Sequence, residues 1–363
     1  MCTALYVIMK PFKTYDEQIE LLQNRGLLPN ISEVTVFHIK NRPGKVLLPV
    51  NPLNIRKLNF SKSQATKYAK ELLQTYGYYN IVNQYNKPFL QSDGNYQADI
   101  DFFMLFSLHQ IDTKMENIIF YPILQVEQRL KTCIAYEFAK SYGPFEGDII
   151  KNYIEPYFQP ANYNQHLKTK KGVPKYTLLI KKLKDIYADA EYKPFQHYKT
   201  HHSHIPIWVF INKLTYGELF HFYEVLKIQP NIAANFKLTP SQLRTIMLFL
   251  NQVRNDCAHF SGFYNQRYPY IKKDVPLLSA FQSKFSFQTQ REVPNMFLLL
   301  IIFKYLLPKS NFDLLSKTVK REIFDFISEK YIPKISEHMK DKLAIPSKKD
   351  CDDKFSFLEH YKI

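Results

Sequence analysis

The chain has 363 residues, of which 45% are hydrophobic, and this share of apolar side chains argues against a disordered protein. Only nine glycines are present, which argues against a turn-rich β fold and favours a mainly α-helical protein. The formal net charge of +16 favours a nucleic acid as partner, although an AT-rich genome would also enrich lysine, so composition leaves both interpretations open.

Two helices are predicted near the N-terminus. In the first, Thr14 and Glu17 are spaced as a capping box, and Gly26 stands where a C-terminal cap belongs. The second is predicted at about residues 63–76, with Ser63 as its N-cap and with alanine, tyrosine and leucine at helical spacing. Both helices therefore follow from local signals.

Short strand-like stretches interrupt this helical pattern. Residues 33–39 and 45–48 are rich in β-branched and other apolar side chains, and the Pro-Gly turn between them predicts a small β-hairpin. Residues 98–140 return to helical spacing, with phenylalanine, leucine, isoleucine and valine on one face. Pro122 is expected to mark either a new helix start or a kink within that stretch.

The middle of the chain, residues 143–206, is rich in proline, tyrosine, lysine and histidine. This composition predicts long surface loops around one or two short helices. Three helices are predicted after it. Thr215 and Glu218 cap the first, Thr239 opens the second just before a proline, and residues 294–306 form a third that is apolar nearly all round.

These patterns predict three parts. A helical N-terminal region spans residues 1–95, and a helical bundle spans residues 96–335, with residues 143–206 as a basic, loop-rich insertion. The bundle ends with an amphipathic helix near 312–330, and residues 336–363 form a polar, lysine-rich tail. The chain lacks the ~20 consecutive apolar residues that cross a bilayer, and the apolar stretch at its N-terminus is too short for a signal peptide. Four scattered cysteines without a CxxC pair suit a reducing compartment, so a cytoplasmic protein is expected.

The strongest chemical signal lies at the end of the helix that is predicted to begin at Thr239 and Pro240. Its last residues include Arg254, Asn255 and His259, and of the eleven histidines only His259 has an arginine five residues before it. This spacing resembles the motif of HEPN ribonucleases. The imidazole of His259 suits proton transfer near neutral pH, and the guanidinium of Arg254 suits the oxygens of a phosphoryl group. Asn255 would orient the histidine or a phosphate.

These residue types predict metal-independent cleavage of RNA, because the 2′-hydroxyl that acts as nucleophile is absent from DNA. Five residues of helix turn through about 500°, which leaves Arg254 and His259 roughly 140° apart around the axis. One helix also supplies a single histidine for two proton transfers, so a homodimer is predicted. From spacing alone, the alternative is a helix cap with an ion-pair cluster, in which His259 faces the helix dipole. No metal or other cofactor is expected.

Several sequence blocks, in order along the chain, resemble the abortive-infection family of AbiD/AbiF-like proteins, which are HEPN-superfamily ribonuclease toxins. The most specific block is the one that contains Arg254 and His259. Lys131 stands where this family commonly has arginine, and Phe260 stands where a second histidine often occurs. The blocks lie at residues 10–19, 25–27, 76–79, 112, 123–132, 205–219 and 254–259.

The resemblance implies a HEPN-type helical bundle and an endoribonuclease toxin that halts growth during phage infection. It also implies that a small structured RNA holds the toxin in check, so RNA is expected both as substrate and as inhibitory antitoxin. The main alternative is a non-catalytic RNA-binding protein of a phage-defence complex. A protein-interaction module that senses phage components, with its positive charge incidental, is a third interpretation.

A basic segment without any acidic residue is a second candidate for RNA binding. Its lysines could follow a phosphate backbone while its tyrosine stacks on a base, or the segment could be a solvated loop. The candidate residues are Lys168, Lys170, Lys171, Lys175, Tyr176, Lys181, Lys182 and Lys184. Residues 201–204 contain three histidines, but because no carboxylate or cysteine lies close in sequence, a solvated loop is favoured over a metal site.

Four further residues have structural interpretations. Trp208 is expected to anchor the core, rather than to act as a stacking platform. Glu127 and Lys131 are spaced for an ion pair along one helix, with a second interpretation in which Glu127 orients His259. Cys257 is expected to pack in the core, because nothing supplies a base for a thiol nucleophile.

Overall fold

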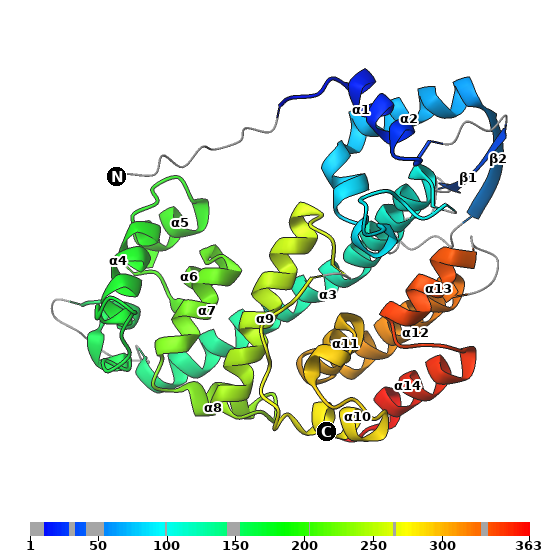
Figure 1. The fold of residues 1–363 in the computed structure, drawn as a ribbon. Coiled ribbons are helices and arrows are strands. Elements are labelled where there is room, and N and C mark those ends of the chain that lie inside the picture. Colours follow the sequence, from blue (N-terminus) through cyan, green and yellow to red (C-terminus); the bar gives the residue numbers. More distant parts are fainter. Residues whose placement is uncertain are drawn as a thin grey trace, which may run out of the picture. The chain divides into compact units, whose positions relative to one another are not determined.

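The computed structural model describes residues 11–28, 33–40, 54–98, 100–143, 153–202, 204–263, 266–327 and 333–363. The fold is mainly α-helical, as the composition predicts (Figure 1). Contacts between residues divide the chain into two units. One comprises Met1–Glu116 and Glu322–Lys340, and the other comprises Asn117–Arg321 and Asp341–Ile363.

The first unit contains the two helices expected near the N-terminus. Helix α1 (Tyr15–Asn24) begins with the expected capping box, in which the Thr14 side chain accepts from the backbone of Glu17. Helix α2 (Lys62–Tyr76) starts earlier than predicted, because Ser61 and not Ser63 is its N-cap. Ser61 forms a full capping box with Gln64, and this reciprocal pair of hydrogen bonds outweighs what a lone serine two residues later would contribute.

The same unit contains a two-stranded antiparallel sheet. Strand β1 (Glu33–Lys40) covers the first predicted strand, and its partner is β2 (Asn54–Ser61), with Glu33 opposite Ser61. Residues 45–48, expected as the second strand, lie outside the described residues. Because β2 leads directly into α2, the last residue of the strand also caps the helix.

A single 41-residue helix, α3 (Phe102–Tyr142), contributes residues to both units. It begins after Asp101, whose carboxylate accepts from the backbone N–H of Met104. Pro122 lies inside α3 and does not start a new helix, although proline cannot donate the helical hydrogen bond at that position. The apolar residues of the predicted periodicity, among them Ile123, Val126 and Leu130, are fully buried.

The middle of the chain contains two short helices, α4 (Lys175–Tyr187) and α5 (Lys193–His202), joined by turns. Helices α6 (Ile207–Phe210), α7 (Tyr216–Val225), α8 (Gln229–Ala234) and α9 (Pro240–His259) follow.

The capping boxes expected for α7 and α9 are confirmed, with Thr215 paired to Glu218 and Thr239 paired to Gln242. These local bonds fix where both helices begin. The expected apolar core helix is also confirmed: α11 (Asn295–Leu306) follows α10 (Pro276–Lys284) and is buried along almost its whole length.

The C-terminal residues form α12 (Lys309–Ile327), α13 (Pro333–Lys342) and α14 (Lys348–His360). The prediction of a polar tail after residue 335 is therefore wrong. Cys351, Phe355 and Leu358 recur at helical spacing on α14 and are fully buried, and α14 packs against α11. This apolar face stabilises the helix in spite of the basic and acidic residues on its other positions. No helix among the described residues is both long enough and apolar enough to cross a membrane.

Candidate active site at the end of helix α9

Helix α9 presents the predicted catalytic residues at its C-terminal end. Its inner face is buried at Leu243, Leu250, Val253 and Cys257, so the helix is anchored up to its last turn. The prediction that Cys257 packs in the core is thereby confirmed. Arg254 is half-buried, whereas Asn255 and His259 are exposed.

Helix α7 runs antiparallel to α9 and packs against it. The Tyr223 hydroxyl, near the end of α7, donates to the Pro240 carbonyl at the start of α9 over 3.1 Å. At the opposite end, a side chain at Gly217 would meet the Asn251 Oδ1 atom at 3.8 Å. The start of α7 therefore lies beside the last two turns of α9.

His259 is the final helical residue, and the chain leaves the helix immediately after it. Phe260 adopts a left-handed conformation, with φ +50° and ψ +46°, and the backbone N–H groups of Phe260 and Ser261 donate to the Asp256 carbonyl. Downstream, the Asn295 amide donates to the carbonyls of Phe263 and Gln266. The exit loop is thus tied to α11 while His259 stays accessible.

Asp256 is a third charged group at this helix end. Burial raises the pKa of its carboxyl, while a hydrogen bond from Tyr268 and the charge of His259 act in the opposite direction. Asp256 precedes His259 by one helical turn, so the two side chains lie on neighbouring positions of the helix surface. Asp256 was not among the predicted site residues, although its three-residue spacing from His259 already indicated that the two side chains are neighbours.

Within one copy of the chain, Arg254 and His259 have different polar neighbours. Arg254 Nη1 approaches Asn255 Oδ1 at 3.5 Å, which is long for a hydrogen bond. The Arg254 Nε atom is buried and has no hydrogen-bond partner within the described ranges. His259 interacts with the charge of Asp256. Among the described residues no hydrogen bond joins Arg254 to His259, as their angular separation around the helix predicts.

Two lysines of the basic segment pair with acidic residues of α7. Lys175 Nζ lies 2.8 Å from Glu224 Oε2, and Lys182 Nζ lies 3.4 Å from Glu218 Oε1. Lys184 lies over the Phe158 ring, and Tyr176 is half-buried. The remaining lysines are exposed and form no ion pair within the described part of the chain. They are Lys168, Lys170, Lys171 and Lys181.

Glu224 connects three helices of this unit. Its carboxylate pairs with Lys175 of α4 and accepts from Arg244 Nε of α9 at 2.9 Å. Burial acts to raise the pKa of Glu224, but hydrogen bonds from His221, Lys175 and Arg244 outweigh it and hold the pKa well below the usual range. The group is therefore ionised, and it helps to seat α9.

The histidines of residues 201–204 do not converge. His201 hydrogen-bonds the His197 carbonyl and stacks on the His197 ring at 4.5 Å, whereas His204 lies against the Tyr153 ring. In the described ranges no three histidine, cysteine or acidic side chains are grouped as metal ligands.

Two structural interpretations from the sequence have different outcomes. Glu127 and Lys131 form the expected ion pair at 2.8 Å, and both side chains are largely buried. Among the described contacts none joins Glu127 to His259. The prediction that Trp208 anchors the core is wrong, because 54% of its surface is exposed. Helix α6 has only four residues, and its inner face is already filled by Ile207 and Phe210.

A family model described as Abi-like protein matches residues 71–265. The matched stretch is more than half of the chain, and it includes α9 with all three predicted catalytic residues. The chain belongs to the Abi-like protein family. No curated protein and no solved structure matches it. Membership of this family points to abortive infection, a defence against phage.

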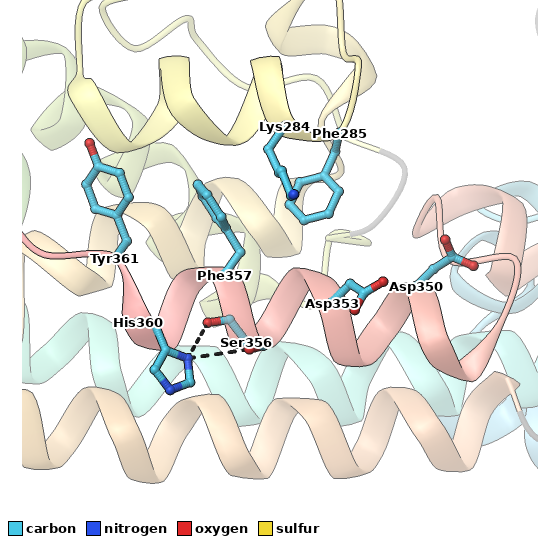
Figure 2. A pocket seen from close by; sticks show the side chains of 8 residues that line it. All are labelled: Lys284, Phe285, Asp350, Asp353, Ser356, Phe357, His360 and Tyr361. Atoms are coloured by element: carbon cyan, nitrogen blue, oxygen red, sulfur yellow. Dashed lines mark hydrogen bonds between the residues drawn. The ribbon is translucent and has the colours of Figure 1, made fainter.

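A groove of about 670 Å³ between α10 and α14 lies outside the stretch that matches the Abi-like family. Figure 2 shows its aromatic side chains between the two helices, and His360 turned back onto its own helix, where it hydrogen-bonds Ser356. None of the predicted site residues lines this groove. Its lining residues are Lys284, Phe285, Asp350, Asp353, Ser356, Phe357, His360 and Tyr361.

Proposed function

We propose that this Abi-like protein is an endoribonuclease toxin of an abortive-infection system, with its active site at the end of α9. The observation that carries the proposal is the accessible end of a firmly anchored helix, whose last two turns carry a half-buried guanidinium, an exposed amide and an exposed imidazole. Such a turn offers charge stabilisation by Arg254, positioning by Asn255 and proton transfer by His259.

The proposed reaction is transesterification. The 2′-oxygen forms a bond to the adjacent phosphorus, and the bond between that phosphorus and the 5′-oxygen breaks. The proton of the 2′-hydroxyl goes to a base, and an acid returns a proton to the departing 5′-oxygen. Arg254 stabilises the added charge on the phosphorane oxygens. The products are a 2′,3′-cyclic phosphate and a 5′-hydroxyl.

Two proton transfers require two groups, and one copy of the motif provides a single histidine. We propose a homodimer in which a second copy supplies the other imidazole across a two-fold axis. The same arrangement would bring Arg254 of one copy toward His259 of the next, which the helix geometry does not achieve within one copy. Mixing wild-type chains with His259→Ala chains tests the idea, because a mixed dimer holds a single imidazole and activity should then fall with the square of the wild-type fraction.

We further propose that the four exposed lysines of the basic segment contact RNA, including a structured antitoxin RNA that restrains the toxin. Lys170, Lys171 and Lys181 carry charges that no acidic residue of the described chain neutralises. Replacing these three by alanine is expected to lower RNA affinity about tenfold. The slope of the logarithm of the binding constant against the logarithm of the salt concentration should become shallower by about two. An unchanged salt dependence would remove this segment from the RNA surface.

The decisive experiment analyses the products of purified protein incubated with RNA in EDTA. Cyclic phosphate ends from the wild type, and none from His259→Ala, are expected. Cleavage that needs a divalent ion would contradict the mechanism. RNA binding by wild-type protein without any cleavage would instead favour the non-catalytic RNA-binding alternative.

A further inference from the structure

Trp208 is the only tryptophan of the chain, and more than half of its surface is exposed. Tryptophan is normally among the most buried side chains on average, because its indole has the largest apolar surface. Its neighbours on either side behave differently: Ile207, Phe210 and Ile211 are buried. Trp208 is therefore the one exposed side chain of α6.

The backbone beneath Trp208 is held firmly. The Phe210 ring stacks on Tyr157 at 4.3 Å and on Phe195 at 5.7 Å, so these two aromatic rings support the short helix α6. The Asn212 amide also donates to the Trp208 carbonyl at 2.8 Å. The indole is thus presented to solvent from a fixed base.

Trp208 lies at the same end of its unit as the proposed active site. Helix α6 is followed by the short 3-10 helix Ile211–Lys213 and then by α7, which lies beside α9 (Figure 1). A side chain at Gly217, near the start of α7, would meet Asn251 of α9. Arg254 and Asn255 follow Asn251 by three and four residues, so they continue the same face of α9 toward its end. Asn212 and Thr215, which lie between Trp208 and Gly217 in the sequence, are exposed, and residues 208 to 217 contain no acidic side chain.

We propose that Trp208 stacks on an unpaired base of the RNA whose phosphodiester is held at Arg254 and His259. This inference rests on the proposed ribonuclease function and adds to it a preference for single-stranded RNA. A base has an aromatic face whatever its identity, so stacking on indole binds unpaired RNA with little sequence preference. Bases inside a duplex have no free face to offer.

The single tryptophan makes the test direct, because all tryptophan emission comes from Trp208. His259→Ala protein, which is expected to leave RNA intact, is titrated with a single-stranded oligouridylate and with a duplex RNA of the same length. Stacking predicts saturable quenching by the single strand and little change with the duplex. Trp208→Ala in the same background is expected to weaken binding of labelled oligouridylate about tenfold, and Trp208→Phe is expected to weaken it less.

The matched control is Tyr136→Ala on α3, since Tyr136 is 65% exposed and lies outside the proposed surface. Its affinity for RNA should be unchanged. Trp208→Phe keeps an aromatic ring on α6, so it also covers the case in which Trp208→Ala does not fold.

Two outcomes would overturn the inference. One is unchanged emission at saturating oligouridylate together with normal affinity in both Trp208 variants. The other is an emission change that follows protein concentration without RNA, which would mean that a second copy covers the indole. Cleavage by the wild type is measured in parallel. Cleavage without quenching rejects only the stacking, whereas quenching without cleavage rejects only the nuclease.

Discussion

Helices α9 and α14 resemble each other in several ways but differ at their last turn. Both have a side-chain N-cap and a buried inner face, and both end in an exposed histidine, His259 or His360. The His360 ring bonds back to the Ser356 carbonyl at 2.8 Å, whereas no described hydrogen bond occupies the ring of His259. Exposure alone does not make a histidine a catalytic candidate. A histidine becomes a catalytic candidate when charged residues surround it and its ring nitrogens are not engaged in hydrogen bonds.

The largest effect expected from this comparison is on catalysis. His259→Ala should lower the rate of RNA cleavage about a thousandfold, because it removes a general acid and base. His360→Ala should change that rate by less than about twofold, since His360 interacts only with its own helix. Initial rates on end-labelled RNA measure both. Equal losses in the two variants would show that the difference between the helix ends has no catalytic meaning.

Arg254 should give the next largest effect. Arg254→Ala is expected to reduce cleavage about a hundredfold, because a positioned cation at the phosphoryl oxygens is lost. Arg254→Lys should recover part of this loss, since it keeps the charge but not the forked geometry. The exposed lysine Lys349 of α14 supplies the control as Lys349→Ala. A full recovery with lysine would contradict bidentate binding of the phosphate.

The two helices are also held by ion pairs of different burial. Glu224 is almost fully buried where it pairs with Arg244 of α9, so Glu224→Gln should reduce the free energy of unfolding by about 2 kcal/mol. Asp352, which pairs with Lys320 at 2.8 Å, is half exposed, and Asp352→Asn should cost less than about 0.5 kcal/mol. Chemical denaturation at pH 7 measures both losses.

The pH dependence sharpens this prediction. Because the folded pKa of Glu224 is lowered, its contribution is present above the unfolded pKa of about 4.3 and is lost as the pH falls. The difference between wild type and Glu224→Gln should therefore shrink in acid. A difference that stays constant with pH would mean that the carboxylate charge does not stabilise the fold.

The smallest effect is expected at Asp256, whose pKa is shifted in the opposite direction to that of Glu224. Burial raises its folded pKa, so the folded state binds the proton more strongly and the wild type gains stability as the pH falls. Asp256→Asn removes the buried charge and should raise Tm by about 1 °C at pH 7. This advantage should disappear in acid, as thermal melts at pH 7 and in acid would show. A lower Tm at pH 7 would indicate that the ionised carboxylate is favourably paired.

Much of the helical framework was predictable because its signals are local. A capping box depends on two side chains three residues apart, so Thr14, Thr215 and Thr239 mark helix starts without knowledge of the tertiary structure. The spacing of Arg254 and His259, together with the family resemblance of the surrounding blocks, indicated the candidate site, and the family match covers that stretch. A strand at Asn54–Ser61 was not predicted, because pairing partners are chosen over long distances.

What the sequence determined by itself is therefore the helical class, the main capping sites and the polar turn at the end of α9. Only the tertiary structure decided that Trp208 faces solvent and that residues of the expected tail pack as α14. Burial depends on which surfaces remain to be covered once other elements have packed. The inner face of α6 is already filled by Ile207 and Phe210, whereas α11 offers an apolar surface, including Phe297, to Phe355 of α14.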